Sequence, residues 1–254
     1  MTEAGSRVFE YADRIFELYA EMENGVREIT GEISGALTIG ASTTIAEYML
    51  PTLLGDFNAR YPEVSIHLKV SNSEGIVSMV EGNTIDLGVV ESPLVNKNLV
   101  VEICRQDQLV AIVPPNHPLA KGKSVAFRDL LDYPFICREE GSGTREVIND
   151  YLSGLPGCAA GLKVAMELGS PEAVKGAVEA GMGVSVVSKA TIQKELRLAT
   201  LVTLTLEPPL FRPFSFVHQK QKFRLRVMEE LFGVCACLLQ EPAGLSPRSK
   251  AFLC

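Results

Sequence analysis

The sequence predicts an α/β protein with two lobes around a central cleft, preceded by a long N-terminal helix. Short apolar strands alternate with helical patterns along most of the chain, and one strand–turn–helix design occurs twice. The first copy covers residues 36–51 and the second covers residues 132–148. A chain of 254 residues is long enough for two lobes that each bury a core.

The first thirty residues have the pattern of one amphipathic helix, and residues 1–32 are predicted to link and dimerise the protein. Val8, Ile15 and Met22 lie seven residues apart, with charged side chains between them. This heptad spacing is typical of a coiled coil, although a helix packed on its own body has a similar stripe. We expect self-association, because the helix precedes every strand on which it could rest.

The first lobe follows the helix. Strands are predicted at residues 37–39, 64–70, 85–90, 99–102 and 108–113, with helices at 45–61 and 73–81. The βαβ order predicts a mainly parallel sheet with helices on both faces. Ser73 is a candidate cap for the second of these helices.

A turn with three prolines at residues 114–118 opens the second lobe. Helices are predicted at residues 127–131, 144–152, 171–180 and 189–195, and strands at 135–137, 164–167, 184–187 and 201–206. A strand at 214–217 and a helix at 224–239 are predicted to return to the first lobe. The predicted parts are therefore residues 36–113 with 210–240 (lobe I), 114–209 (lobe II) and a loose tail at 241–254.

Composition argues against several classes of function. A net charge of −7 repels phosphate backbones, so these residues alone are expected to bind DNA poorly. The N-terminus lacks the apolar segment of a signal peptide, and no stretch is apolar enough to cross a bilayer. The six cysteines have no metal-ligand spacing, which favours reduced thiols in a cytoplasmic protein without a metal site.

The turn of the first repeat places Ser42, Thr43 and Thr44 at the start of a helix. The first amide groups of a helix have no acceptor within it, and the helix dipole is positive there. Small hydroxyl residues at this position predict a site for an anion or carboxylate. Helix capping alone explains the same residues equally well.

The turn of the second repeat has more features of a binding site. Ser142, Gly143 and Thr144 supply hydroxyl groups and an accessible backbone, and Arg145 can hold a carboxylate with two hydrogen bonds. The alternative is an ordinary turn with a surface arginine paired to a nearby glutamate. Ser73 and Ser170 are predicted to add donors from two further helix starts.

The sequence offers no catalytic centre. Gly141-Ser142-Gly143 is not the nucleophile elbow of hydrolases, because its glycines flank the serine directly. Residues 181–184 follow a helix and precede a strand, which is the reverse of a dinucleotide-binding fingerprint. We therefore expect no enzyme activity and no cofactor.

Several motifs together resemble the LysR-type transcriptional regulators. They are Gly-Ala-Leu-Thr-Ile-Gly-Ala at residues 35–41, Phe-Asn-Ala-Arg-Tyr-Pro at 57–62, Asp-Leu-Gly-Val-Val at 86–90 and the His-Pro-Leu-Ala of 117–120. Within that family, residues 138–145 and 169–185 look like the subgroup of CysL and CbbR. Those proteins regulate genes of sulfur assimilation and carbon fixation.

The resemblance implies an effector-binding domain of two Rossmann-like lobes, with the type 2 fold of periplasmic binding proteins. Family effectors bind at helix N-termini between the lobes, which here correspond to Ser42, Thr43, Thr44, Ser142, Thr144, Arg145 and Ser170. It also implies a homodimer, a tetramer for the full-length protein, and promoter binding through a winged helix absent from these residues.

Two other classes stay open on the sequence. A solute-binding protein shares the fold but normally carries a signal sequence, and a two-lobe transferase or lyase needs a base or covalent carrier. The ligand is expected to be a small anionic metabolite. A sulfur oxyanion, a carboxylate, a sugar phosphate and a nicotinamide cofactor all fit the donors described.

Overall fold

The computed structural model describes residues 2–30, 33–94, 96–155, 161–220 and 226–239. The described residues form two compact units: one has parts of 38–52 and 68–220, and the other has parts of 1–37, 53–67 and 226–239. All nine predicted site residues belong to the first and larger unit. The predicted tail at 241–254 lies outside the described residues.

The helix predicted at the N-terminus is confirmed as α1, Glu3–Thr30. Most described apolar side chains of its heptad pattern are exposed, including Val8, Ile15 and Met22 at 68%, 64% and 56%. These three exposed apolar side chains are spaced seven residues apart, so they form a stripe that a second helix could cover.

In the described part of the chain, seven strands form the main sheet, in the order β2-β1-β3-β9-β4-β8 with β5 beside β9. Their bounds are β1 Gly35–Ser42, β2 Val64–Ser71, β3 Leu87–Val90, β4 Leu99–Val113, β5 Ser124–Ala126, β8 Ser185–Ser188 and β9 Val202–Gln219. A second sheet pairs β6 (Phe135–Arg138) with β7 (Val164–Leu168) in parallel.

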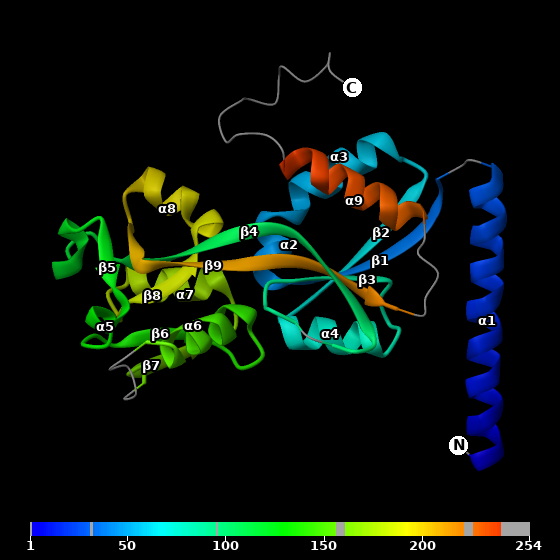
Figure 1. The fold of residues 1–254 in the computed structure, drawn as a ribbon, viewed down its shortest axis with the longest axis horizontal. Helices are drawn as coiled ribbons and strands as arrows, with labels where there is room; N and C mark the ends of the chain where they lie inside the picture. Colours follow the sequence, from blue (N-terminus) through cyan, green and yellow to red (C-terminus); the bar gives the residue numbers. More distant parts are fainter. Residues whose placement is uncertain (1, 31–32, 95, 156–160, 221–225, 240–254) are drawn as a thin grey trace. The chain divides into compact units, whose positions relative to one another are not determined.

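The expectation of a mainly parallel sheet is wrong, because β4 and β9 are long antiparallel partners (Figure 1). The sequence predicted two short strands in place of each of them. Pro208 and Pro209, which follow the strand predicted at 201–206, both lie within β9. In the pairing of the two strands, Leu109 lies opposite Leu210, and the next residue, Val110, lies opposite Thr205. The prolines between them therefore have no partner in β4, and their missing amide protons break no hydrogen bond between β4 and β9.

The helices largely follow the prediction. Their bounds are α2 Thr43–Tyr48, α3 Leu50–Arg60, α4 Ser73–Glu81, α5 Phe127–Leu130, α6 Gly143–Ser153, α7 Pro171–Glu179, α8 Gln193–Leu198 and α9 Arg226–Leu239, with short 3₁₀ turns at Pro118–Lys121 and Lys189–Ile192. The single helix predicted at 45–61 is divided into α2 and α3. Pro51 has no amide proton to continue α2, which accounts for the break.

The apolar face of α6 fixes where that helix begins. Val147, Ile148 and Leu152 are buried in one cluster with Phe135 of β6 and Leu204 of β9. Spacings of one and four residues place these three side chains on one side of the helix. The polar N-terminal turn of α6 is therefore held in place by a packed core.

In the smaller unit, α9 buries Met228, Leu231 and Val234 on one face. The hydroxyl group of Tyr61, which follows α3, donates a hydrogen bond to the Glu230 carboxylate of α9. This bond joins segments of the unit that are 169 residues apart in sequence.

A close backbone approach before β8 gives a stability prediction. A Cβ atom at Gly183 would lie 2.3 Å from the backbone oxygen of Pro134, whereas one at Gly176 of α7 would meet nothing within 4 Å. We expect Gly183→Ala to lower the free energy of unfolding by about 1–3 kcal/mol. Gly176→Ala should leave it unchanged or raise it by about 0.5–1 kcal/mol, since alanine favours helix. Urea denaturation of both variants measures this, and equal midpoints would contradict the packing described.

Candidate functional site

The start of α6 has an N-cap serine that does not cap. The Ser142 side chain makes no cap hydrogen bond, and its Oγ is buried with no partner among the described residues. The helix has eleven residues, and its first amide groups have no acceptor within the helix. A buried hydroxyl group and free amide groups therefore lie together at a helix N-terminus.

The start of α2 repeats this feature. Ser42 is its N-cap residue, makes no cap hydrogen bond, and has a buried Oγ without a partner in the described part of the chain. At the start of α4, the Ser73 Oγ is also buried with no hydrogen-bond partner among the described residues. The N-cap residue of α4 is Asn72, and not Ser73 as predicted. Thr43 donates weakly to the Ser71 backbone oxygen at 3.5 Å.

The two repeated turns are joined through a carboxylate that the sequence analysis did not consider. Glu91 follows β3 and is 1% exposed. Its Oε1 accepts hydrogen bonds from the hydroxyl groups of Thr44 and Thr144, each at 3.2 Å. Thr44 and Thr144, predicted from separate repeats to share one site, are therefore brought together.

Arg212 of β9 balances this carboxylate. Its side chain is fully buried and forms ion pairs with Glu91 at 3.3 Å and with Asp107 of β4 at 2.9 Å. Its Nη1 also donates to Thr144 Oγ1 at 2.7 Å. Burial raises the pKa of Asp107 despite the opposing effect of the Arg212 guanidinium, and the nearby Glu91 charge raises it further.

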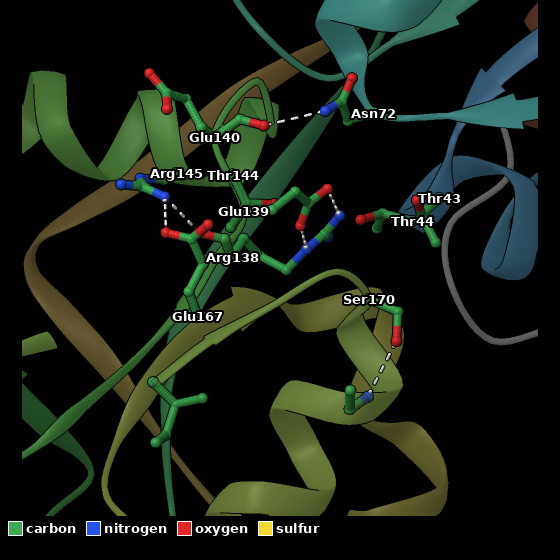
Figure 2. Close-up of polar contacts among 12 residues, drawn as sticks. Thr43, Thr44, Asn72, Arg138, Glu139, Glu140, Thr144, Arg145, Glu167 and Ser170 are labelled. Carbon is green, nitrogen blue, oxygen red and sulfur yellow. Dashed lines mark hydrogen bonds and ion pairs between the residues drawn. The ribbon is translucent and has the colours of Figure 1, made fainter. Parts of the chain in front are cut away.

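Arg145, the predicted anion ligand, is engaged elsewhere. Its guanidinium group pairs with Glu167 of β7 and donates to the Arg138 backbone oxygen. Figure 2 shows this pair on the side of Thr144 away from Thr43 and Thr44. The hydrogen bond with Glu167 is the main reason that the pKa of Arg145 is raised.

Arg138 at the end of β6 is directed toward the other predicted residues. Its side chain is 5% exposed and is held by two hydrogen bonds to Glu139, at 2.7 and 2.8 Å. Figure 2 shows it pointing toward Thr43 and Thr44, above Ser170. Its charge also lowers the pKa of Glu47 on α2, against a larger rise from burial, which places a cation near α2.

Two helix starts have structural contacts of their own. Ser170 accepts a hydrogen bond from the Ala173 amide and is an ordinary N-cap of α7. At α4, the Asn72 side chain donates to the Glu140 backbone oxygen (Figure 2). The Glu74 amide donates to the Gly141 backbone oxygen. These bonds hold the turn before α6 against the start of α4.

Sequence reasoning missed Glu91, Arg138, Asp107 and Arg212. Glu91 and Arg138 each stand at the end of a buried strand, and a polar residue at that position is a readable signal. Asp107 and Arg212 lie inside strands that were not predicted at full length. Their partners come from distant sequence, so no local pattern indicates them.

The comparisons with known proteins agree with this architecture. The family model described as the LysR substrate binding domain matches residues 30–239. The chain belongs to the LysR family. It is 35% identical over 223 residues to the RuBisCO operon transcriptional regulator of Allochromatium vinosum, covering 87% of this chain and 72% of the relative. It is 34% identical over 238 residues to the HTH-type transcriptional regulator YeiE of Escherichia coli K12, covering 92% and 78%.

A solved structure has the same fold. The CcmR regulatory domain of Synechocystis PCC6803, in complex with 2-PG, is 30% identical with a TM-score of 0.74, covering 82% of this chain and 98% of that domain. The LysR domain has the type 2 fold of periplasmic binding proteins, so the fold implied by the resemblance is confirmed. The matched relatives are transcriptional regulators and not enzymes.

The described residues contain no group of three or more His, Cys, Asp or Glu side chains able to hold a metal ion. No helix among them is both long and apolar enough to span a bilayer.

The buried charge cluster gives a second stability prediction. Arg212→Leu would leave Glu91 and Asp107 buried without their cation, and we expect the free energy of unfolding to fall by about 3–5 kcal/mol. Arg145→Leu removes a partly exposed pair and should cost less than about 1 kcal/mol. Chemical denaturation near neutral pH measures both, and equal losses would contradict the importance assigned to burial.

The loss in Arg212→Leu should also depend on pH. Arg212 lowers the pKa of Asp107, so its removal moves that pKa further above the unfolded value. A carboxyl group with a raised folded-state pKa contributes stability below its unfolded pKa, and this contribution is lost as pH rises through the folded pKa. The difference from the wild type should therefore shrink as pH falls from about 8 to about 4.

Proposed function

We propose that this domain senses a small anionic effector, bound between lobe I (residues 36–113 and 210–240) and lobe II (114–209) at the start of α6. The LysR substrate-binding domain of transcriptional regulators binds small-molecule effectors. To this family property we add that the effector is an anion, that it binds at the start of α6, and that the lobes have these boundaries. The residues predicted for the site are Ser42, Thr43, Thr44, Ser73, Ser142, Gly143, Thr144, Arg145 and Ser170. We add Arg138 as the cation that contacts the anion, in place of Arg145.

The uncapped serines carry the proposal. An N-cap hydroxyl group normally accepts a bond from an amide of the first helical turn, as Ser170 does on α7. Ser142 and Ser42 make no such bond, and both hydroxyl groups are buried without a partner among described residues. A buried polar group without a partner costs free energy, which an added ligand could recover. Of the two helices, α6 is the longer, so its dipole favours an anion more.

The effector seen in a relative supports an anion-screening experiment. The CcmR regulatory domain was solved with 2-PG. We propose 2-PG as the first probe for this chain, together with sulfate, a small carboxylate, a sugar phosphate and a reduced nicotinamide cofactor. An effector that binds only the folded domain raises its thermal midpoint with concentration. A screen in which no anion shifts the midpoint would count against the proposed function.

We also propose that effector binding changes the arrangement of a homodimer, and of a tetramer in the full-length regulator. LysR regulators oligomerise and bind DNA. The exposed stripe of α1 supports the dimer. We assign promoter binding to a winged helix outside residues 1–254, because the net negative charge of these residues repels the DNA phosphates. A role at promoters supports a cytoplasmic location.

Arg138 and Arg145 give a paired binding test. We expect Arg138→Gln to weaken 2-PG binding at least tenfold, because this buried cation is directed toward α2. Arg145→Gln should change the affinity less than threefold, because its guanidinium group lies on the side of Thr144 away from Thr43 and Thr44. Isothermal calorimetry on folded proteins decides between them. A larger loss for Arg145→Gln would restore Arg145 as the anion ligand.

The α1 stripe gives a test of self-association. Ile15→Asn should weaken the dimer at least tenfold, because each copy loses an apolar side chain, worth about 1.5–3 kcal/mol when buried. Arg14→Asn changes the neighbouring exposed residue and should leave the dimer within threefold of the wild type. Sedimentation at several concentrations measures both variants. Equal dissociation constants for Ile15→Asn and the wild type would rule out this stripe as the interface.

A further inference from the structure

Glu91 uses the hydroxyl protons of two residues assigned to effector binding. Thr44 and Thr144 both donate to its Oε1. A hydroxyl group carries one proton and two lone pairs. While these bonds exist, neither threonine has a proton left for an added anion.

The surrounding contacts keep this arrangement in place. Thr144 Oγ1 also accepts from Arg212 Nη1, so the hydroxyl group must direct its proton away from Arg212 and toward Glu91. A Cβ atom at Gly143 would lie 3.0 Å from Glu91 Cγ and 2.8 Å from Ser73 Oγ. The first residue of α6 therefore packs directly on Glu91, and no larger side chain fits between them.

The charge balance of the cluster is negative. Two carboxylates, Glu91 and Asp107, share the single guanidinium group of Arg212. Glu91 and Arg212 are both 1% exposed, and Asp107 is 6% exposed, so water screens their charges little. A negative charge placed beside the two threonines is repelled by Glu91.

We propose that Glu91 is a specificity-determining residue of the effector site. It is a resident carboxylate that occupies the position between the α2 and α6 starts and limits the affinity for an added anion. This inference rests on the proposed function. The effector's anionic group is then bound by Ser142, the free amides of α6 and Arg138, and not by the hydroxyl protons of Thr44 and Thr144.

The first test removes the charge of Glu91 with little change in shape. Glu91→Gln should bind 2-PG at least tenfold more tightly than the wild type in isothermal calorimetry. Asp107→Asn is the matched control, because it removes the other carboxylate of Arg212, whose second partner is the Ser188 hydroxyl group. Its affinity should stay within threefold of the wild type. Unchanged or weaker binding by Glu91→Gln overturns the inference, as does an equal gain in Asp107→Asn.

A second variant decides the matter if Glu91→Gln does not fold. Glu91→Met removes the carboxylate and keeps an unbranched side chain of similar length. The affinity for 2-PG should again rise at least tenfold, because the buried negative charge that repels the anion is gone. Unchanged or weaker binding by folded Glu91→Met overturns the inference.

The outcomes also separate this inference from the proposed function. Binding of 2-PG by the wild type, with no gain in Glu91→Gln, contradicts the role of Glu91 alone. Binding that appears only in Glu91→Gln supports it. Absence of binding in the wild type and in every variant contradicts the anionic effector and the role of Glu91 together.

Discussion

The buried guanidinium group of Arg212 is the contact on which the arrangement of the candidate site depends. From β9 it pairs with Glu91 after β3 and Asp107 of β4, and it donates to Thr144 of α6. Glu91 in turn accepts from Thr44 of α2. One cation thus ties three strands to two helix starts. Rearranging the cluster would cost free energy, because Glu91 and Asp107 would be left buried without the cation that pairs with them.

That constraint changes how the two repeated turns should be understood. As sequence, both offer hydroxyl groups to an anion, and the second adds Arg145. In the folded domain, Thr44 and Thr144 face a carboxylate of the chain itself, and Arg145 is bound by Glu167. Among the described residues of these helix starts, the groups left with free capacity are Ser42, Ser73, Ser142 and the first amides of α6. The groups that can bind an anion therefore lie within a few residues of Glu91, whose negative charge opposes that binding.

Local patterns predicted most of the elements, and long-range contacts account for what they missed. Alternation in β2 and the Ser170-Pro171 start of α7 are local signals, and both elements were predicted within one residue of their ends. Pro51 is equally local, but its effect on the helix through residues 45–61 was overlooked. The length of β4 and β9 depends on their mutual pairing, and Arg212 meets Asp107 across 105 residues of sequence. Such contacts leave no periodic trace in the chain.

A crystal structure of this domain with 2-PG tests the central claim most directly. The account predicts an anionic group within hydrogen-bond distance of Ser142 Oγ and the first amides of α6, with Arg138 turned toward it. Glu91 should keep its bonds to Thr44 and Thr144. An anion bound elsewhere, with the Ser142 hydroxyl still unpartnered, would contradict the assignment of the α6 start as the effector site.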